Sequence, residues 1–174
     1  IQINVWTTDT DPYAADEFHP AGLFIAASQY WNAQPGYIPR DVTHVITGRD
    51  LEGNLIGMAM MSSLDNPYYK GGYGCSQGDY WNTELVVIHE VGHNFGANHD
   101  SSTPKTIMYP SAGNNEMRFS QTSINEVLAY ITPLTCLPLS TKPYPVVVAA
   151  PLSGPAPLTV NFNGSSSTDN GSIV

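Results

Sequence analysis

Basic residues, cysteines and long hydrophobic runs are all scarce in this sequence. Only six of its 174 residues are Lys or Arg, against fifteen Asp and Glu, and the net charge is −9. Such a balance argues against a basic patch of the kind that binds nucleic acid or an anionic membrane. No stretch approaches the roughly 18 consecutive apolar residues that span a bilayer. We therefore expect no nucleic-acid partner and no insertion into a membrane.

The chain also lacks the charged and then apolar start that marks a signal peptide. It opens on a strand-like alternation over residues 1–7, so a targeting segment is expected to have been removed or left out. Apolar residues make up 41% and charged residues 12% of the chain, which is typical of a folded protein. The length suits one ordinary domain with a core, plus a small appendage.

Only two cysteines are present, Cys75 and Cys136, and they form no Cys-x-x-Cys motif. Two buried free thiols are one interpretation. We favour a disulfide, because the rest of the chain has the features of an exported protein. In the chain-entropy model, closing a loop of that length stabilises the fold by roughly 4 kcal/mol.

Hydrophobic periodicity and turn signals predict alternating strands and helices before the chain changes in composition near residue 137. The expected strands are residues 1–7, 41–47 and 55–62, and the expected helices are residues 18–33, residues 85–95 and a last helix from Ser120. Residues 64–80, rich in Gly, Tyr and Asp, are expected to form a loop. The last helix is expected to bury a stripe made of Ile124, Val127, Leu128 and Ile131.

The residues that point most clearly to chemistry lie on the second expected helix. His89 and His93 are four positions apart, so a helix places both imidazoles on one face, where they can bind zinc at about 2.0–2.1 Å. Glu90 projects beside such a metal and can take a proton from zinc-bound water and pass it to the leaving amine. Gly96 allows a sharp turn out of the helix, which brings His99 back as a third ligand.

Three protein ligands leave one position open, which is the arrangement of a catalytic zinc site and not of a closed structural one. A bare His-Glu-x-x-His can arise by accident in any helix. Here Gly96 and His99 also fall at the required offsets, and a chance match at all five positions is rare. The sequence therefore predicts one catalytic zinc ion.

Residues 89–99 match the extended motif of the metzincin zinc metalloproteases, and Asp100 is typical of the adamalysin/reprolysin branch. Residues 106–110 resemble the Met-turn that lies beneath the zinc in that family, with Met108 as its methionine. Further likenesses lie at residues 47–59, 74–76 and 118–123. The chain thus resembles an adamalysin-type metzincin over about residues 1–137.

This resemblance implies an α/β (α+β) fold with a twisted mixed sheet, an edge strand, an active-site helix and a C-terminal helix. It also implies that Cys75 pairs with Cys136. Adamalysins usually begin with a strand and a helix that have no counterpart here, so the chain is either a shorter variant or trimmed. Some of them bind a structural calcium through that region, and a Ca²⁺ site therefore cannot be carried over.

The composition shifts after the expected catalytic domain, residues 1–137. Residues 138–145 are rich in proline and are expected to form a stiff linker. Residues 146–174 resemble the opening of a polycystic-kidney-disease (PKD) domain, an immunoglobulin-like β-sandwich found in many secreted bacterial enzymes. Two short strands are expected there, at residues 146–148 and 158–162. The likeness suggests a bacterial or archaeal source and docking to a surface or matrix through this tail.

Taken together, the patterns predict a secreted or cell-surface zinc endopeptidase that uses Glu90 to activate the zinc-bound water. A peptide substrate would add as an extended strand to the edge at residues 56–61, and residues 109–113 would line the pocket just past the cleaved bond. His44 is interpreted as a hydrogen-bonded interior residue and not as a fourth ligand. The alternative is a non-catalytic surface or assembly component that uses the same fold and the PKD-like tail for binding.

Overall fold

The computed structural model describes residues 4–5, 10–13, 19–36, 40–78, 82–137, 146–154 and 158–166. The chain divides into two compact units, Ile1–Leu137 and Pro138–Val174. The strand expected at residues 1–7 falls largely outside the described residues, and the linker expected at residues 138–145 falls wholly outside them. No helix in the described ranges is long and apolar enough to cross a membrane.

The first unit is built on a three-stranded mixed sheet with the strand order β1-β3-β2. The strands are β1 (Val42–Thr47), β2 (Gly57–Ala59) and β3 (Gly72–Gln77). β1 runs parallel to β3, with Val45 opposite Cys75, whereas β2 runs antiparallel to β3, with Met58 opposite Cys75. β2 is therefore an edge strand of the described sheet. This is a small mixed α/β fold, as predicted.

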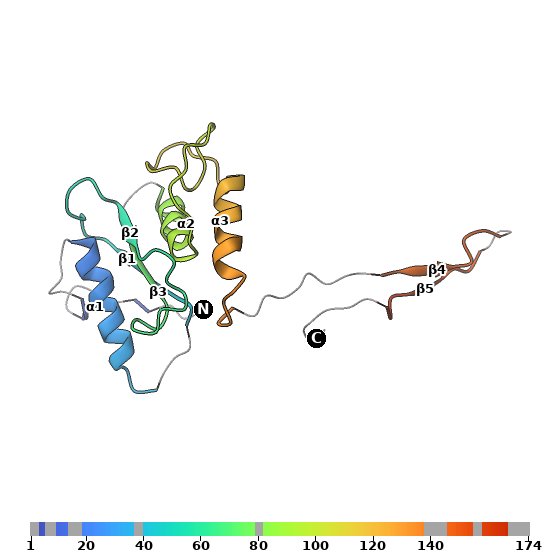
Figure 1. Ribbon diagram of the computed structural model, residues 1–174, viewed down its shortest axis with the longest axis horizontal. Coiled ribbons are helices and arrows are strands. Elements are labelled where there is room, and N and C mark those ends of the chain that lie inside the picture. Colours follow the sequence, from blue (N-terminus) through green and yellow to red (C-terminus); the bar gives the residue numbers. More distant parts are fainter. Residues whose placement is uncertain are drawn as a thin grey trace. The chain divides into compact units, whose positions relative to one another are not determined.

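In the part of the chain that the structure describes, three helices accompany the sheet: α1 (Pro20–Ala33), α2 (Thr83–Asn94) and α3 (Gln121–Ile131). Figure 1 shows α1 on one side of the sheet and α2 on the other, with α3 beyond α2. The start of α3 follows the predicted capping rule, because the Ser120 side chain accepts a hydrogen bond from the Ser123 amide at 3.1 Å. His19 caps α1 in the same way, through a 3.2 Å bond from the Ala21 amide.

The face of the sheet toward α1 is covered by large apolar side chains. Tyr73 and Cys75 of β3 are fully buried there against Leu23 and Ala27 of α1. Met58 of β2 also packs against this cluster. Because side chains alternate along a strand, the residues between these, on β2 and β3, must face α2.

The face toward α2 carries small residues. A Cβ atom on Gly72 would lie 2.9 Å from Asn94 Cγ, and one on Gly57 would lie 2.6 Å from Glu90 Oε1. Gly74 and Ser76 complete this side of β3, where Ser76 Oγ lies 2.8 Å from His44 Nε2. The absence of side chains at Gly57 and Gly72 lets α2 approach the sheet closely.

Two expectations about this unit are wrong. Residues 64–80 are not only a loop, since they contain β3, the central strand. Its glycine-rich sequence has the composition of a turn, but in the structure Gly72 leaves space for α2 to pack closely against the strand. The last helix buries its apolar stripe only in part: Val127 packs against the core and Ile131 is half-buried, but Ile124 and Leu128 are exposed, and Ser123 is the buried residue of α3.

The expected disulfide is also absent, because Cys75 and Cys136 are both free. Cys75 is buried in β3, where its thiol lies 3.5 Å from the Pro20 carbonyl oxygen of α1. Burial raises the pKa of this thiol to about 12. Cys136 is exposed beyond the end of α3. The two residues therefore have separate environments, and Cys75 acts as a small core residue.

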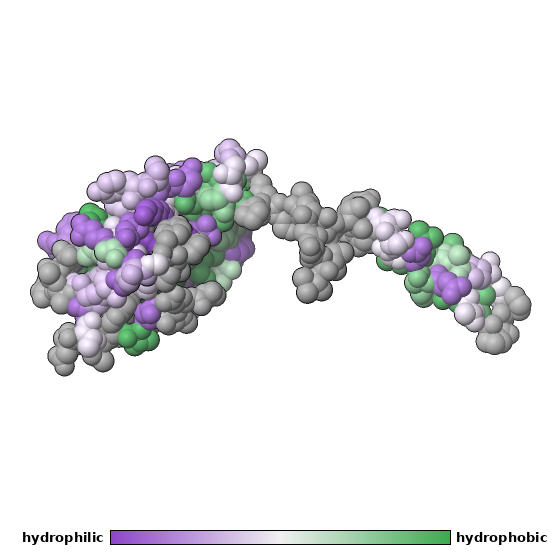
Figure 2. Space-filling model, turned by 90° about the horizontal axis from the view of Figure 1, so that it is seen from below, coloured by the Kyte–Doolittle hydropathy of each residue, from purple (hydrophilic) through white to green (hydrophobic). Residues whose placement is uncertain are grey.

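Among the described residues of the second unit, β4 (Val148–Ala150) and β5 (Asn161–Asn163) form an antiparallel pair of strands. These overlap the two strands expected in the tail. Several of its large apolar side chains are exposed, including Val147, Leu152 and Phe162, and Figure 2 shows hydrophobic surface on this unit. Two strands alone make no core.

Candidate metal centre

Three histidine side chains converge at the C-terminal half of α2. His89 and His93 come from successive turns of this helix, and His99 comes from the segment that follows it. Their Nε2 atoms lie 3.1 Å apart for His89 and His99, 3.1 Å for His89 and His93, and 3.2 Å for His93 and His99. This spacing is close to that of three ligands around a tetrahedral zinc with bonds of about 2.0–2.1 Å. The three predicted ligands are thus brought together.

Backbone carbonyls fix which nitrogen of each helical histidine is free. His89 Nδ1 lies 2.7 Å from the Ile107 oxygen, and His93 Nδ1 lies 2.8 Å from the Ala97 oxygen. A carbonyl only accepts, so each Nδ1 carries the proton and each Nε2 presents a lone pair. Two lone pairs facing each other at 3.1 Å repel unless a cation lies between them. The donor set therefore fits a zinc ion.

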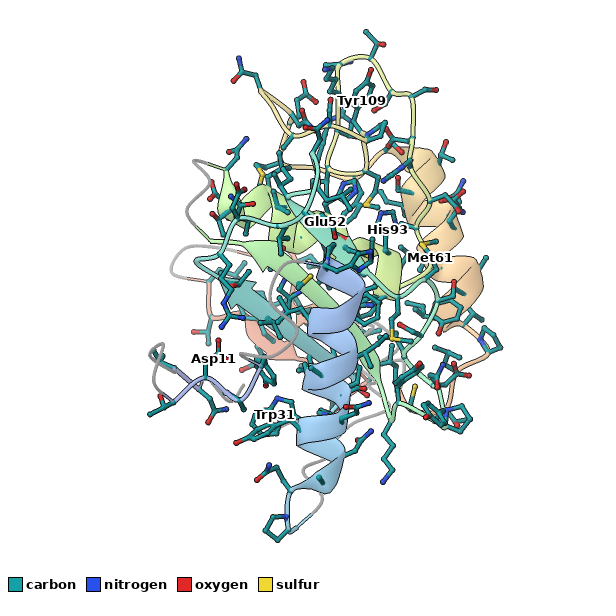
Figure 3. The ribbon with its side chains drawn as sticks, turned by 90° about the vertical axis from the view of Figure 1, so that its left-hand side faces the viewer. Asp11, Trp31, Glu52, Met61, His93 and Tyr109 are labelled. Carbon is teal, nitrogen blue, oxygen red and sulfur yellow. The ribbon has the colours of Figure 1, made fainter. Side chains whose placement is uncertain are left out.

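Burial supports the same neutral state. Desolvation lowers the pKa of His89 to about 4 and also lowers the pKa of His93, in each case despite the opposing effect of the carbonyl hydrogen bond. A neutral imidazole is the form that binds a metal. Figure 3 labels His93 on α2 and Tyr109 on the segment after it.

A left-handed turn carries the chain out of α2 toward His99. Gly96 has φ +87°, and a Cβ atom there would lie 2.8 Å from Tyr130 Cβ of α3. The Ala97 amide then bonds back to the Gly92 oxygen at 3.0 Å, which closes the end of the helix. Only glycine suits both the backbone angle and the close approach of α3.

The two neighbours of His99 are held by hydrogen bonds. On one side, the Asn98 amide donates to Glu126 Oε2 of α3 at 2.8 Å. On the other, Asp100 accepts from the Thr106 hydroxyl at 2.7 Å, the Ser102 hydroxyl at 2.8 Å and the Ser123 hydroxyl at 3.2 Å. Burial raises the pKa of Asp100, but the hydrogen bonds from Thr106 and Ser102, among others, outweigh it and hold that pKa far below its usual range. His99 itself is exposed, so its position depends on these flanking contacts.

Glu90 lies on the buried side of the helix, next to β2. It is 6% exposed, and burial raises the pKa of its carboxyl to about 8. The carboxylate fits there because Gly57 has no side chain. Sequence reasoning found Glu90 from the motif but missed Gly57, because nothing local links residue 57 to residue 90.

Met108 and Asn94 secure the helix from two sides. Met108 is fully buried, and its sulfur lies where a Cβ atom on Gly92 would be only 2.6 Å away. Asn94 donates through Nδ2 to the Met60 oxygen at 2.8 Å and the Tyr73 oxygen at 3.0 Å. The Met-turn motif predicts the position of Met108, whereas no motif in the sequence points to Asn94.

A cavity of about 140 Å³ opens beside the histidines. His89, Glu90 and His99 form one end of it. Its other lining residues come from the approach to β2, from the first turns of α2 and from the segment after Met108: Asn54, Leu55, Ile56, Gly57, Leu85, Val86, Ile107, Tyr109, Pro110, Ala112 and Asn115. Of the expected pocket residues 109–113, three line the cavity. His44 lies apart from it, bonded to Ser76, and burial lowers its pKa to about 4.

Comparison with known proteins gives a consistent result. The chain is 36% identical over 104 residues to disintegrin and metalloproteinase domain-containing protein 19 of Mus musculus, covering 59% of this chain and 11% of that protein. It is also 30% identical over 64 residues to disintegrin and metalloproteinase domain-containing protein 15 of Homo sapiens, covering 36% of this chain and 7% of that protein. The chain thus spans about a tenth or less of the length of these relatives.

A crystal structure of metalloproteinase-II from Bacteroides fragilis is also similar, at 17% identity and a TM-score of 0.49, covering 66% of this chain and 36% of that one. The model of the Reprolysin-like metallo-peptidase family M12B matches residues 1–100, which include all three histidines and are more than half of the 174 residues. The chain therefore belongs to the reprolysin-like M12B family of metallopeptidases.

Proposed function

We propose that this protein is a zinc-dependent endopeptidase of the adamalysin type, in which His89, His93 and His99 bind the metal and Glu90 is the catalytic acid and base. The observation that carries the proposal is the convergence of three Nε2 atoms within 3.1–3.2 Å of one another, next to a buried carboxyl group. A structural zinc site has no use for such a carboxyl group. The family supports zinc-dependent proteolysis in general.

Bound zinc would supply a Lewis acid that polarises the scissile carbonyl and makes water more acidic. Glu90 takes the proton from the attacking water and later gives it to the leaving amine. Burial raises the pKa of this carboxyl, and the positive charge of bound zinc would lower it again, so that Glu90 could act first as a base and then as an acid. Asn94 and Gly57 keep this residue and the helical histidines against the sheet, and Asp100 positions the segment that carries His99.

The outer edge of β2 suits an extended peptide. The Gln77 amide donates to the Ile56 oxygen at 2.8 Å, and the Met60 amide donates to the Tyr73 oxygen at 2.9 Å. Even-numbered residues of this segment therefore bond to β3, and the backbone groups of Gly57 and Ala59 point the other way. A substrate strand can pair with these groups and place the side chain after the cleaved bond in the 140 Å³ cavity.

The decisive test is Glu90→Gln, which removes the acid and keeps the size. We expect casein cleavage to fall at least about 10³-fold, because general acid–base catalysis contributes on that order. Zinc content, measured by atomic absorption, should stay at one ion per chain. Glu84→Gln is the matched control, since Glu84 is an exposed acid on the first turn of the same helix. Undiminished cleavage by Glu90→Gln would rule out the mechanism.

A second candidate is a non-catalytic binding protein, which the exposed apolar residues of the second unit favour. A casein assay with and without a chelator separates the two functions. A protease loses activity with the chelator and regains it with added zinc, whereas a binding protein cleaves nothing in either condition.

We propose that residues 1–137 form the catalytic domain, residues 138–145 a linker, and residues 146–174 the first part of a PKD-like sandwich. The division of the chain after Leu137 and the pair β4–β5 support these boundaries. The protein would then act outside the cell or at its surface, in a bacterium or archaeon, and dock through the tail. Expressing a longer segment of the protein and solving its structure would test the sandwich assignment.

A further inference from the structure

One face of α3 lies along the segment that carries the third histidine. Three side chains of this face, spaced three and four positions apart, each approach one residue of the segment. The pairs are Tyr130 with Gly96, Glu126 with Asn98, and Ser123 with Asp100. Because the residue numbers rise along the segment as they fall along the helix, the two run in opposite directions. The segment of residues 96–100 is therefore aligned on α3 over its whole length.

The histidine in the middle of this segment is held less firmly than the other two. The Nδ1 atoms of His89 and His93 lie 2.7 Å and 2.8 Å from backbone carbonyl oxygens, which fix both rings. No described residue forms such a bond with Nδ1 of His99, and this side chain is exposed. Partners outside the metal shell normally orient its ligands. The orientation of His99 must therefore come from the backbone on either side of it.

Glu126 is the residue of α3 that holds this backbone nearest to the ligand. One carboxylate oxygen accepts from the Asn98 backbone amide at 2.8 Å, and the other accepts from Asn98 Nδ2 at 3.2 Å. Glu126 is half-buried and forms no ion pair with any described residue. Hydrogen bonds to a charged acceptor are stronger than those to a neutral one. Both oxygens of this carboxylate are thus used on the residue directly before His99.

The contact with Glu126 is important because the chain here has few other restraints. Between Ala97 and Asp100, the bond from the Asn98 amide is the only backbone hydrogen bond formed with a described residue. If it were lost, His99 would sample more positions before the metal binds. Binding would then have to order the segment, and the lost entropy would weaken the affinity.

We propose that Glu126 is a positioning residue of the metal centre, which holds Asn98, and through it His99, in the geometry that binds zinc. The assignment rests on the zinc ligands proposed above and adds a residue of α3 that strengthens zinc binding without touching the metal. Residues that orient metal ligands typically change the affinity by about 10- to 100-fold. Glu126 acts through a neighbour of the ligand, so we expect the lower end, about tenfold.

The first test measures zinc affinity by titrating the zinc-loaded chain with a chromogenic chelator of known affinity. Glu126→Ala should bind zinc about tenfold more weakly than the native chain. Glu126→Gln should recover most of this loss, because its side-chain oxygen can still accept from the Asn98 amide. The control Asn125→Ala, at the adjacent exposed position of α3, should keep the native affinity. Native affinity in Glu126→Ala overturns the proposal. So does an equal loss in Glu126→Gln, which would assign the effect to charge, or in Asn125→Ala, which would assign it to a general loosening of the helix.

The second test uses the native zinc-loaded chain and also serves if Glu126→Ala does not fold. Amide hydrogen exchange, followed by NMR, compares Asn98 with His99, whose amide has no acceptor among the described residues. We expect the Asn98 amide to exchange at least about tenfold more slowly, and equal rates would overturn the proposal.

Neither measurement needs peptide cleavage, so the two proposals can fail separately. A tenfold loss of zinc affinity in Glu126→Ala, together with a native chain that cleaves no casein, would reject the peptidase function and keep the role of Glu126. Unchanged affinity in Glu126→Ala, together with normal cleavage by the native chain, would reject the role of Glu126 and keep the function.

Discussion

The two faces of the sheet are built differently, although β3 contributes to both. Toward α1, large side chains such as Tyr73 and Leu23 are buried in one apolar cluster. Toward α2, the same strand presents Gly72, Gly74 and Ser76, and polar residues such as Asn94 fill the interface. The first face has the composition of an ordinary core. The second face buries less apolar surface, and its small residues let a helix with polar functional residues lie close to the sheet.

This difference suggests a division of labour between the faces. Burial of apolar surface on the α1 side supplies stability that the α2 side gives up. Close packing on the α2 side sets the positions of Glu90 and the helical histidines. Changes on the α1 face should therefore lower stability and spare catalysis, whereas changes that displace α2 or Glu90 on the other face should impair catalysis.

The largest expected effect comes from removing a buried apolar side chain on the face of the sheet toward α1. Leu23→Ala removes a side chain that is only 1% exposed and leaves a cavity, which should lower the free energy of unfolding by about 3 kcal/mol. Urea denaturation followed by circular dichroism measures this change. Leu128→Ala on α3 is the control, because that residue is 51% exposed and should cost less than about 0.5 kcal/mol. Equal losses for both variants would contradict the contrast between the buried and exposed residues.

The next largest effect should come from adding a methyl group at Gly57, on the face of the sheet toward α2. In Gly57→Ala, the new methyl group would lie 2.6 Å from Glu90 Oε1 and 2.8 Å from Val86 Cγ1, so the carboxyl group must move. We expect kcat/KM for peptide cleavage to fall about 100-fold, since small displacements of a catalytic group have effects of that order. Because the methyl group would also crowd Val86, we expect the free energy of unfolding to fall by about 1–3 kcal/mol.

The adjacent residue provides the matched comparison. Met58 points to the α1 face, where it packs against the apolar cluster. Met58→Ala should lower the free energy of unfolding by about 1–2 kcal/mol and leave kcat/KM within about twofold of the native value. If both substitutions changed activity equally, the two faces would not be functionally distinct.

A smaller effect is expected from His44, the titratable residue of β1 on the α2 face. Burial lowers its pKa from 6.5 to about 4, so between these values the unfolded chain binds more protons than the folded one. Stability should therefore fall as the pH drops through this window, and by pH 5 His44 should account for a loss of about 2 kcal/mol. Above pH 7 it should contribute no such dependence.

His44→Gln tests this, because glutamine can still bond to Ser76 Oγ but cannot titrate. The free energy of unfolding of both proteins should be measured at pH 7 and pH 5, and the native protein should lose about 2 kcal/mol more than the variant. Burial also lowers the pKa values of His89 and His93, but both residues are present in both proteins, so their effects cancel. Identical losses would show that His44 is hydrated in the folded state.

The contrast between the faces also explains what the sequence could reveal. α1, β1 and α2 follow from hydrophobic periodicity and local turn signals, and the histidine spacing predicts the three side chains that do converge. The sequence does not predict β3, because a glycine-rich segment has the composition of a turn. The need for a glycine at position 72 becomes clear only from its contact with α2, which begins after the strand has ended. Gly57 is not predicted for the same reason, since its importance lies in the contact with the Glu90 carboxyl group, which a distant segment contributes.

The smallest effect is expected from reduction of the protein, and it bears on how the apolar face is held. Cys75 lies in that face as a free thiol, and Cys136 is exposed and free. A disulfide between them would close a long loop and contribute roughly 4 kcal/mol, all of which dithiothreitol would remove. Because burial and not a covalent bond holds Cys75 against α1, we expect the thermal unfolding midpoint to be the same with and without dithiothreitol. Thiol titration in denaturant should find two free thiols per chain. A midpoint that drops by several degrees on reduction would show that a disulfide, and not burial alone, stabilises the apolar face.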